Sequence, residues 1–333
     1  MEILAYGVQA DEQPLLEKTF AGRHSLRTLA VFLNRDTAPL AAGYPVVSSS
    51  VNAVLDAGTL TLLAAGGTGL IAQRSTGFNN IDLDAAAELG LTVARVSYYS
   101  PYAVAEHAWT LALAVNRRLT RAASRSREFD FRLDGLLGRD IHGMTVGVIG
   151  TGKIGECFAR IAAGFGTELL GWDIAQNPAC LELGMTYAEL PDLLARADLV
   201  SLHVPLVPAT HHLIDSAALA RMKDDAILVN SSRGGLVDSA ALVETVRDGR
   251  LSGVGLDVYE EETGVFFTDR SIQGISDDVL ARLVTFPQVL VTSHQAYFTR
   301  TAVGQIIDAT ARNIDDFAAG RTNENTLVPG NRS

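Results

Sequence analysis

The sequence predicts an α/β protein made of two doubly wound parallel-sheet domains, one inserted into the other. Short apolar runs alternate with helical patterns along most of the 333 residues, which is typical of parallel strands joined by helical crossovers. A glycine-rich turn follows one buried strand near the middle of the chain. A further helical pattern at residues 299–319 comes after the last strand of that central sheet, so we expect it to return to the first domain.

The first hundred residues have the pattern of a small open parallel sheet, without a glycine-rich turn of the kind found in the middle of the chain. Strands are expected at residues 3–6, 25–31, 46–49, 70–73 and 92–96. Helices are expected at residues 12–21, 59–65 and 82–89. Gly90 ends the last of these helical patterns.

A proline marks the start of the second domain. After Pro101, residues 102–119 have the pattern of one long helix that is apolar on most sides, as expected for a helix buried between domains or subunits. Residues 125–139 are mixed and polar, which indicates a crossing segment. Strands of the second sheet are expected at residues 146–149, 168–172, 199–203, 226–230, 254–257 and 289–292.

Residues 146–155, VGVIGTGKIG, lead a strand directly into a turn with three spaced glycines and then into a helical pattern. Gly150 suits the tight turn, and Gly152 lets the backbone approach a pyrophosphate. Gly155 lets the helix pack closely on the strand. The free N–H groups at the N-terminus of that helix would bind the phosphates.

An acidic residue stands where such a site needs one. Asp173 ends the strand at residues 168–172, and its carboxylate can bind both hydroxyls of an adenosine ribose. A 2′-phosphate would be repelled by this charge, so the pattern favours NAD over NADP. Lys153 and Ile154, at the start of the helix, complete the expected phosphate-binding turn. The second domain is therefore predicted to be a Rossmann domain that binds NAD.

Composition excludes several classes of partner. The formal net charge of −11 argues against a surface for nucleic acid or anionic membranes. No stretch approaches the roughly 20 apolar residues of a membrane span, and the N-terminal residues lack the basic region of a signal peptide. Cys157 and Cys180 belong to no CxxC spacing and are expected to be reduced. We therefore expect a cytoplasmic protein without a nucleic-acid or membrane partner.

Reactive groups in open α/β sheets gather at the carboxyl ends of the strands, so the residues after each strand are the candidates. Arg233 follows the strand at residues 226–230, an acidic run follows the next strand, and His294 follows the last. An arginine can hold a carboxylate with two hydrogen bonds, and a histidine can exchange a proton. An arginine, an acid and a histidine beside a nicotinamide are a suitable set for hydride transfer.

These residues also have plainer interpretations. His203 ends a strand as well, so position alone does not distinguish it from His294. Arg233 could be a surface salt-bridge residue, and the glutamates at 260–262 could form a solvated loop. The pair His211–His212 has the composition of a metal site, but no nearby Cys or Asp completes a ligand set. We therefore expect a loop there and no metal site.

The motifs together resemble the NAD-dependent D-isomer-specific 2-hydroxyacid dehydrogenases over nearly the full length of the chain. The matching segments are STGFNNIDLDAAAELGL (75–91), AVAEHAWTLAL (103–113), VGVIGTGKIG (146–155), LHVPLVPATHHLI (202–214), NSSRGGLVD (230–238), GLDVYEEE (255–262) and SHQAYFT (293–299). The resemblance implies a catalytic set of Arg233, Glu262 and His294. It also implies that Asp257 holds the nicotinamide carboxamide. The residues that it places along the cofactor are His203, Val204, Pro205, Thr210, Ser231 and Ser232.

Within that family the sequence is most similar to the D-lactate dehydrogenase branch. Its RSTGFNNIDL segment resembles the substrate loop of the branch, which implies that the backbone amides of Thr76 and Gly77 hold the substrate carboxylate. Residues 264–269, GVFFTD, resemble an insertion of this branch, and Tyr99 matches a tyrosine that lines the lactate pocket. Tyr297 departs from the branch, which often has Phe there, and the residues around Tyr99 are also less typical. Both departures concern the preferred length of the substrate side chain.

The expected reaction is the reversible, NADH-dependent reduction of pyruvate to D-lactate, and its stereochemistry comes from the resemblance alone. His294 would donate the proton, Glu262 would keep His294 protonated, and Arg233 would hold the carboxylate. One alternative is a D-2-hydroxyacid dehydrogenase for a bulkier 2-keto acid, such as phenylpyruvate or a branched-chain analogue. Another is a non-catalytic, NAD-sensing protein similar to the corepressors of the same fold.

The expected domains and partners follow from these assignments. Residues 1–100 and 299–333 should form a flavodoxin-like substrate domain, and residues 101–298 the inserted Rossmann domain. The partners should be a small 2-keto or 2-hydroxy acid and a second copy of the chain. A homodimer is expected, and a tetramer is also open.

Overall fold

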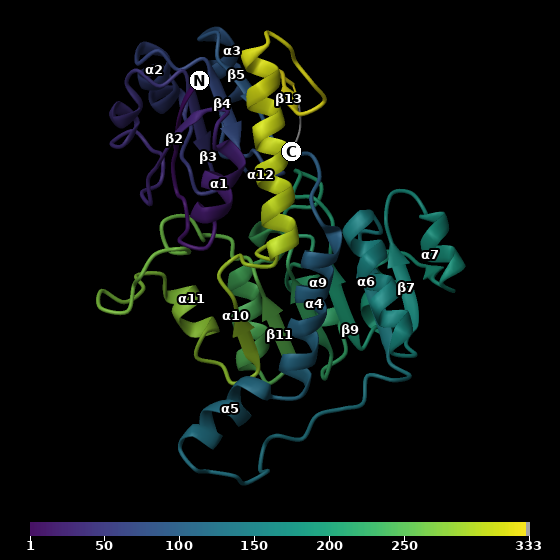
Figure 1. Ribbon diagram of the computed structural model, residues 1–333. Coiled ribbons are helices and arrows are strands. Elements are labelled where there is room, and N and C mark those ends of the chain that lie inside the picture. Colours follow the sequence, from purple (N-terminus) through teal and green to yellow (C-terminus); the bar gives the residue numbers. More distant parts are fainter. Residues whose placement is uncertain (331–333) are drawn as a thin grey trace. The chain divides into compact units, whose positions relative to one another are not determined.

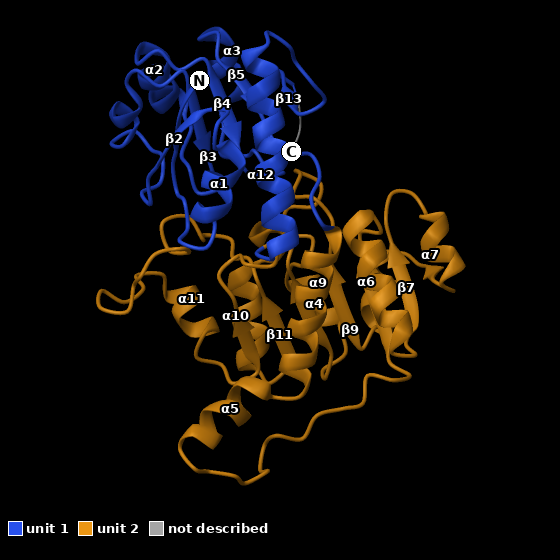
Figure 2. Ribbon diagram, in the orientation of Figure 1, with its two compact units in different colours: residues 1–100, 298–333 blue, residues 101–297 orange. Residues whose placement is uncertain are grey.

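The computed structural model describes residues 1–330, and the chain divides into two compact units (Figure 2). Unit 1 comprises Met1–Ser100 and Phe298–Ser333, and unit 2 comprises Pro101–Tyr297. Each unit contains one sheet with helices packed against it (Figure 1). The predicted fold class, two parallel-sheet α/β domains, is confirmed.

Unit 1 is built on six strands in the order β13-β5-β4-β3-β1-β2. Strands β1 to β5 are parallel and follow the flavodoxin-like order 2-1-3-4-5. The short strand β13, which the sequence did not predict, pairs antiparallel with β5 at the edge. The strands are β1 (Glu2–Ala5), β2 (Ser25–Thr28), β3 (Val46–Ser49), β4 (Leu70–Gln73), β5 (Thr92–Ala94) and β13 (Thr326–Leu327).

The helices of unit 1 begin where local side chains can cap them. Asp56, Asp82 and Thr299 each accept a hydrogen bond from the backbone N–H three residues further on, which satisfies one free donor of the helix. The last of these helices, α12, packs against α1 and β4. The helices are α1 (Gln13–Phe20), η1 (Ala38–Ala41), α2 (Ala57–Ala65), α3 (Leu83–Glu88) and α12 (Arg300–Ala318).

Unit 2 contains seven parallel strands in the order β12-β11-β10-β9-β6-β7-β8. This is the Rossmann order 3-2-1-4-5-6 with one further strand at the edge. The order reverses between β6 and β9, where Val146 pairs with Leu199, so ligands should bind at the carboxyl ends of these two strands. The strands are β6 (Thr145–Ile149), β7 (Glu168–Trp172), β8 (Thr186–Tyr187), β9 (Leu199–Leu202), β10 (Ile227–Asn230), β11 (Gly253–Leu256) and β12 (Val289–Val291).

Two apolar clusters enclose this sheet. In one, α4 packs against α6, and the rings of Trp109 and Phe158 meet edge to face at 5.3 Å. The other includes side chains from α8, α9, α10 and α11. Within residues 1–330, no helix is both long and apolar enough to cross a membrane. The helices are α4 (Pro101–Asn116), α5 (Leu119–Arg127), α6 (Lys153–Gly164), α7 (Pro178–Glu182), α8 (Leu190–Arg196), α9 (Ser216–Arg221), η2 (Gly234–Leu236), α10 (Ser239–Arg247) and α11 (Asp278–Leu283).

Both cysteines lie in the apolar interior of unit 2. Cys157 and Cys180 are buried and free, so they form no disulfide with each other. Burial raises the pKa of both thiols, because an apolar environment disfavours the charged thiolate. They act as small apolar core residues.

The single helix predicted at residues 102–119 is wrong at its C-terminal end. Helix α4 ends at Asn116, and α5 begins at Leu119. Between them Arg118 has a φ of 53°, in the left-handed region. Its guanidinium donates a hydrogen bond to the carbonyl of Ser252, far along the chain. This distant contact holds the break, and local periodicity contains no sign of it.

The mixed, polar segment predicted at residues 125–139 begins in the last turn of α5 and exposes apolar side chains. Helix α5 reaches Arg127, and irregular backbone follows. Figure 1 shows α5 and this segment extending away from the sheet of unit 2. The segment exposes large apolar side chains, which in a folded protein often mark an interaction surface. They are Phe129 (84% exposed), Phe131 (72%), Leu133 (80%) and Leu137 (91%).

Candidate active site

Two glycines in the turn after β6 lie too close to other backbone to carry a side chain. Gly150 has a φ of +92°, and a Cβ there would lie 2.7 Å from the carbonyl carbon of His203 and the nitrogen of Val204. A Cβ on Gly155 would lie 1.9 Å from the carbonyl oxygen of Gly150. Gly150 therefore makes the tight turn, and Gly155 allows α6 to pack closely on the strand.

Gly152 has a different role, because open space surrounds its Cα. It is the N-cap of α6, and within residues 1–330 no side chain caps this helix and a Cβ on Gly152 would meet no atom within 4 Å. The first turn of α6 contains Lys153, Ile154 and Gly155. A helix N-terminus without a side-chain cap fits an anion such as a pyrophosphate, which can accept hydrogen bonds from the backbone.

Asp173 lies beside this turn. It follows β7, and its carboxylate accepts hydrogen bonds from the backbone N–H (2.6 Å) and the hydroxyl (3.1 Å) of Thr151. The N–H of Ile174 donates to its other oxygen at 2.7 Å. The acid is thus held next to the glycine turn, where dinucleotide sites bind the hydroxyls of the adenosine ribose. This arrangement fits NAD and puts negative charge where a 2′-phosphate would lie.

The residues after β9 and β10 complete the expected cofactor site. The hydroxyl of Ser231 is buried and has no hydrogen-bond partner within residues 1–330, so it offers a polar group to a ligand. Ser232 donates to the carbonyl of Val204 at 2.7 Å, and Thr210 donates to the carbonyl of Pro205 at 2.7 Å. These two bonds order the loop after β9. The uncapped helix and the unpartnered hydroxyl both fit a dinucleotide.

His203, at the end of β9, packs against the ring of Phe158, and its place along the cofactor stays a prediction. Its Nε2 lies 3.0 Å from the hydroxyl oxygen of Ser201, and its ring centroid lies 4.9 Å from that of Phe158. Burial lowers the pKa of His203 to about 3, so the ring carries no charge at neutral pH. Of the two strand-end histidines, His294 is the one with a carboxylate partner.

His294 and Glu262 form a hydrogen-bonded pair beyond β12 and β11. The Nδ1–H of His294 donates to Oε1 of Glu262 at 2.7 Å. The two side chains are only 16% and 22% exposed, so the pair is well shielded from water. A carboxylate in this position fixes the tautomer and orientation of the imidazole. The other ring nitrogen, Nε2, is then left for exchange of a proton.

Arg233 follows β10, the strand that pairs with β11, and so starts from the same edge of the sheet as Glu262. It is half-buried, and its Nη1 donates to the carbonyl of Ser232 at 2.7 Å. The next residue, Gly234, presses against the loop after β11, because a Cβ there would lie 2.0 Å from the carbonyl carbon of Tyr259. The loops that carry Arg233 and Glu262 are therefore in direct contact.

Asp257 holds the loop that carries His294. It is fully buried, and its backbone carbonyl accepts a hydrogen bond from the N–H of His294 at 2.7 Å. Its carboxylate accepts hydrogen bonds from the N–H groups of Gln295 at 2.9 Å and Ala296 at 2.8 Å. His294 itself has a φ of 53°, which is uncommon for a residue with a side chain. The hydrogen bonds that Asp257 accepts from this loop hold the backbone in this conformation.

His107 on α4 and Thr292 also contact the carboxylate of Asp257, and the sequence patterns predicted no role for either. The hydroxyl of Thr292 donates at 2.5 Å, and Nε2 of His107 lies 3.2 Å from the same oxygen. Burial tends to raise the pKa of Asp257, but these groups and the N–H groups of Gln295 and Ala296 hold it below its ordinary value. The available sequence signal was a histidine within an otherwise mostly apolar helical pattern.

Asp257 is predicted to bind the nicotinamide carboxamide. The carboxylate that would do so already accepts hydrogen bonds from the protein. Oδ1 accepts hydrogen bonds from Thr292 and Gln295, and Oδ2 accepts one from Ala296. Asp257 is therefore a positioning residue for the His294 loop in the structure as it stands. Its contact with the carboxamide stays a prediction.

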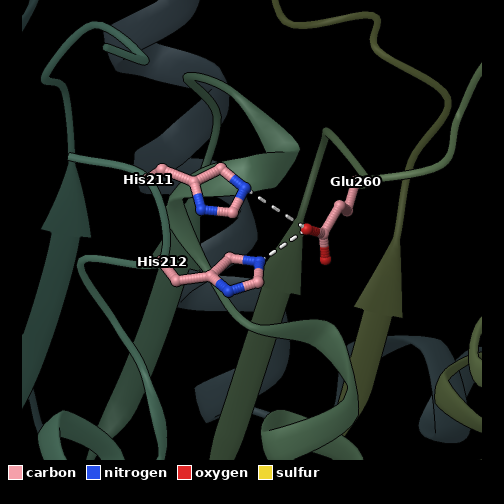
Figure 3. A group of neighbouring side chains, drawn as sticks. All are labelled: His211, His212 and Glu260. Carbon is pink, nitrogen blue, oxygen red and sulfur yellow. Dashed lines mark hydrogen bonds and ion pairs between the residues drawn. The ribbon is translucent and has the colours of Figure 1, made fainter. Parts of the chain in front are cut away.

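The glutamates at 260–262 do not form the uniformly solvated run that was one interpretation of them. Glu262 pairs with His294, Glu261 is exposed, and Glu260 accepts a hydrogen bond from His212 at 2.5 Å. The sequence predicted that no nearby Cys or Asp completes a ligand set with His211–His212, and the structure places a glutamate, Glu260, beside both rings (Figure 3). The sequence alone did not indicate that Glu260 is a neighbour of His212, because 48 positions separate the two residues.

The predicted substrate loop belongs to unit 1 and follows β4. Side-chain donors bind the carbonyl groups of Thr76 and Gly77 at 3.0 Å and 2.7 Å, so the loop is held through its carbonyls. Of the two predicted pocket tyrosines, Tyr99 belongs to unit 1 and Tyr297 is the last residue of unit 2. Both are half-buried.

Comparisons with known proteins show which proteins this chain is similar to. A family model described as "D-isomer specific 2-hydroxyacid dehydrogenase, NAD binding domain" matches residues 109–296. The 2-hydroxyacid dehydrogenase homolog 1 of Schizosaccharomyces pombe is 46% identical over 330 residues, covering 98% of this chain and 99% of the relative. The D-lactate dehydrogenase of Escherichia coli is 42% identical over 329 residues, covering 98% of this chain and 100% of the relative. A solved structure of the pyruvate reductase of Chlamydomonas reinhardtii aligns with a TM-score of 0.93 at 40% identity, covering 98% of both chains.

Proposed function

This chain belongs to the D-isomer-specific 2-hydroxyacid dehydrogenase family, and on that premise we propose that it reduces pyruvate to D-lactate with NADH, reversibly. It is an NAD-dependent oxidoreductase that acts on D-2-hydroxyacids and their 2-keto forms, so the prediction of the family, of an enzyme and of NAD is confirmed. The choice of pyruvate and the roles of individual residues are the proposal. The observation that carries them is the pair of His294 and Glu262 at 2.7 Å.

Reduction of a 2-keto acid needs a hydride for the carbonyl carbon and a proton for the carbonyl oxygen. NADH, when bound, supplies the hydride. His294 donates the proton from Nε2, because Glu262 occupies Nδ1 and holds the ring in one orientation. General acid catalysis of this kind contributes about 10²- to 10⁴-fold to the rate.

Arg233 binds the substrate carboxylate and polarises the keto group. A guanidinium can donate two parallel hydrogen bonds to a carboxylate and keeps its charge at any physiological pH. The proposal is supported by the place of Arg233, one strand from Glu262 and in a loop that contacts the loop after β11. Its contact with the carbonyl of Ser232 limits the positions that the side chain can adopt.

The remaining substrate contacts rest on the family resemblance. The backbone amides of Thr76 and Gly77 bind the carboxylate, and Tyr99 and Tyr297 line the pocket for the substrate side chain. The fixed carbonyls of Thr76 and Gly77 support the first assignment, because a loop held in this way can present its amides in a constant geometry. The loop after β9 and the buried hydroxyl of Ser231 serve the cofactor.

The alternative substrate is a bulkier 2-keto acid. The tyrosine at position 297 motivates it, since this residue stands where the D-lactate branch often has Phe. An apolar pocket discriminates by only about 1–3 kcal/mol per methylene, so relatives of one branch can differ in preference. A panel of pyruvate, 2-ketobutyrate, oxaloacetate and phenylpyruvate, compared by kcat/KM for NADH oxidation, tests the proposal. It fails if phenylpyruvate or another large 2-keto acid is the best substrate.

We also propose that two copies of the chain associate. The exposed apolar side chains of the segment after α5 support this, since a monomer would leave all four in water. A second copy could cover them in a symmetric interface. Light scattering after gel filtration should give a molar mass twice that of the chain. In the double variant Leu133→Asp, Leu137→Asp, the measured mass should shift toward that of the monomer. A wild-type monomer would contradict the proposal.

A further inference from the structure

A cluster of three side chains lies at the loops after β9 and β11, separate from the pair of His294 and Glu262. Figure 3 shows His211 and His212 side by side with their rings toward Glu260. The two rings are stacked, with centroids 4.0 Å apart and planes 26° apart. Nε2 of His212 lies 2.5 Å from Oε1 of Glu260, and Nε2 of His211 lies 3.9 Å from the same oxygen. One nitrogen or oxygen from each residue lies within 4.8 Å of the other two.

We propose that His211, His212 and Glu260 bind one divalent transition-metal ion, with Zn²⁺ the best match. Imidazole nitrogens suit zinc, copper and nickel, whereas Mg²⁺ and Ca²⁺ prefer sites made of oxygen alone. Two histidines and one glutamate are a known zinc ligand set, with water in the remaining position. The side chains of His211, His212 and Glu260 are 55%, 33% and 24% exposed, so water can reach the ion.

The distances in the cluster require only small movements to accept the ion. Zinc binds nitrogen at about 2.0–2.1 Å and carboxylate oxygen at about 2.0–2.2 Å, so two ligand atoms around it lie roughly 3.4 Å apart. The His212–Glu260 contact would lengthen toward this value, and the His211–Glu260 contact would shorten toward it. The ion would then replace the proton that the imidazole of His212 shares with the carboxylate.

The backbone already holds the two histidines together. His212 has a φ of 50°, in the left-handed region, and its N–H donates to the carbonyl of Gly235 at 2.8 Å. The N–H of His211 donates to the carbonyl of Val207 at 3.0 Å. This conformation sets consecutive rings face to face, where an extended backbone would point them to opposite sides. A site formed in advance has a smaller ordering cost when the ion binds.

The need for His211 distinguishes a metal site from a simple ion pair between His212 and Glu260. At 3.9 Å it adds no hydrogen bond to the pair, and more than half of its side chain is exposed. A structural ion pair would function without it, whereas a metal site would lose one of its three protein ligands. Removal of His211 is therefore the decisive change, and because its side chain is exposed the variant should fold as the wild type does.

A bound ion would link the loop after β9, which carries His211 and His212, to the loop after β11, which carries Glu260. Glu260 precedes Glu262 by two positions, and its backbone nitrogen would lie 2.3 Å from a Cβ at Gly234, next to Arg233. Binding to the folded form alone stabilises a protein in proportion to the logarithm of ion concentration over Kd. The bound ion should therefore raise the midpoint of thermal unfolding.

The test uses the full chain without a histidine tag, freed of metal by a chelator and studied without NAD or substrate. Isothermal titration with zinc chloride should give one site per chain, and His211→Ala and Glu260→Gln should each abolish it. Cobalt(II) in the same experiment should develop visible absorption bands that His211→Ala removes. The matched control is His142→Ala, which removes an exposed histidine elsewhere in unit 2 and should bind zinc as the wild type does.

The unfolding midpoint provides a second readout. Zinc should raise it for the wild type and for His142→Ala, and should leave it unchanged for His211→Ala, whose midpoint without metal should equal that of the wild type. Retention of the zinc site in His211→Ala, or its loss only in His294→Ala, would overturn the proposal. Because zinc binding is measured without substrate, either result leaves the proposed reaction to be judged by its own assays.

Discussion

The backbone N–H of His294 donates a hydrogen bond to the backbone carbonyl of Asp257 at 2.7 Å, which ties the residue beyond β12 to the residue beyond β11. The carboxylate of the same aspartate binds the N–H groups of Gln295 and Ala296. A buried carboxylate thus sets the backbone from which the proposed proton donor projects. The geometry of His294 depends on Asp257 as well as on its side-chain partner Glu262.

Asp257→Asn should destabilise the protein in a pH-dependent way. The pKa of Asp257 is lower in the folded protein than in the unfolded chain, so its ionised form adds stability above the unfolded pKa of about 3.9. That stability is lost as the pH falls through the lower folded value. The amide group cannot accept the hydrogen bonds of both backbone N–H groups and the Thr292 hydroxyl, which should cost about 1–3 kcal/mol at neutral pH.

Urea unfolding at neutral pH and at pH values below about 4 checks this prediction, with Asp192→Asn as the control because that side chain is 54% exposed. The difference between Asp257→Asn and the wild type should narrow at the lower pH, and the control should stay close to the wild type throughout. A difference that stays constant across the pH range would show that the charge is not responsible.

His294→Ala should lower kcat for pyruvate by at least about 100-fold, because the reaction loses its proton donor. Binding of NADH, measured by fluorescence, should change little, since the loss concerns a step after binding. The control is His142→Ala, an exposed histidine with no assigned role, which should keep wild-type turnover. Near-normal kcat in His294→Ala would remove this residue from the mechanism.

Arg233→Lys should reduce kcat/KM for pyruvate by roughly 10- to 150-fold. An ammonium keeps the charge but cannot form two parallel hydrogen bonds to a carboxylate, and such charge-assisted bonds contribute about 1.5–3 kcal/mol. Arg196→Lys is the matched control, because Arg196 is exposed and pairs with Asp192 on its own helix. If Arg233→Lys equals the wild type, the carboxylate is bound by other groups.

The enzyme should use NADH in preference to NADPH, and Asp173→Ala should narrow the difference. The carboxylate of Asp173 is held beside the glycine turn by Thr151, where it favours ribose hydroxyls and repels a 2′-phosphate. Comparison of kcat/KM for the two cofactors, in wild type and variant, measures the effect. We expect the change mainly in KM, with kcat for NADH preserved; an equal preference in the wild type would contradict the assignment.

Gly234→Ala should destabilise the protein by about 1–3 kcal/mol or more, because its Cβ would lie 2.0 Å from the carbonyl carbon of Tyr259. The two loops that carry Arg233 and Glu262 would have to move apart, so kcat should fall as well. Gly304→Ala in α12 is the matched control, since a Cβ there meets no atom within 4 Å and alanine favours a helix. Urea unfolding should show opposite signs for the two variants.

Local sequence patterns predicted much of the fold because periodicity and capping act over a few residues. The strands at 46–49, 70–73 and 168–172 have the expected bounds. The two-residue strands β8 and β13 were missed, because each exists through its pairing with β7 or β5 and has little pattern of its own. The break after α4 was missed for a similar reason, since a contact with Ser252 holds it.

The candidate site was predictable to the same extent. The rule that reactive groups follow the strands of a parallel sheet made Arg233, an acidic run and His294 candidates. The family resemblance then singled out Arg233, Glu262 and His294 as a set. His107 and Thr292 were not predictable in this way, since 185 positions separate them and α4 reaches Asp257 only when it packs on the sheet. In the sequence Glu260 is one of three consecutive glutamates, and only the structure shows that it lies beside His211 and His212.

The sequence by itself determined the family, the cofactor and the strand ends at which chemistry could occur. Each of these depends on short motifs whose glycines, acids and spacing have local physical requirements, such as the backbone contacts of Gly150 and Gly155. The family resemblance already paired Glu262 with His294. Only the tertiary structure decided which partners two other carboxylates serve: Glu260 lies beside His211 and His212, and Asp257 binds the loop between β12 and Tyr297. Those pairings arise because adjacent parallel strands bring together residues that are far apart in the chain, and a hydrogen bond forms only between atoms about 3 Å apart.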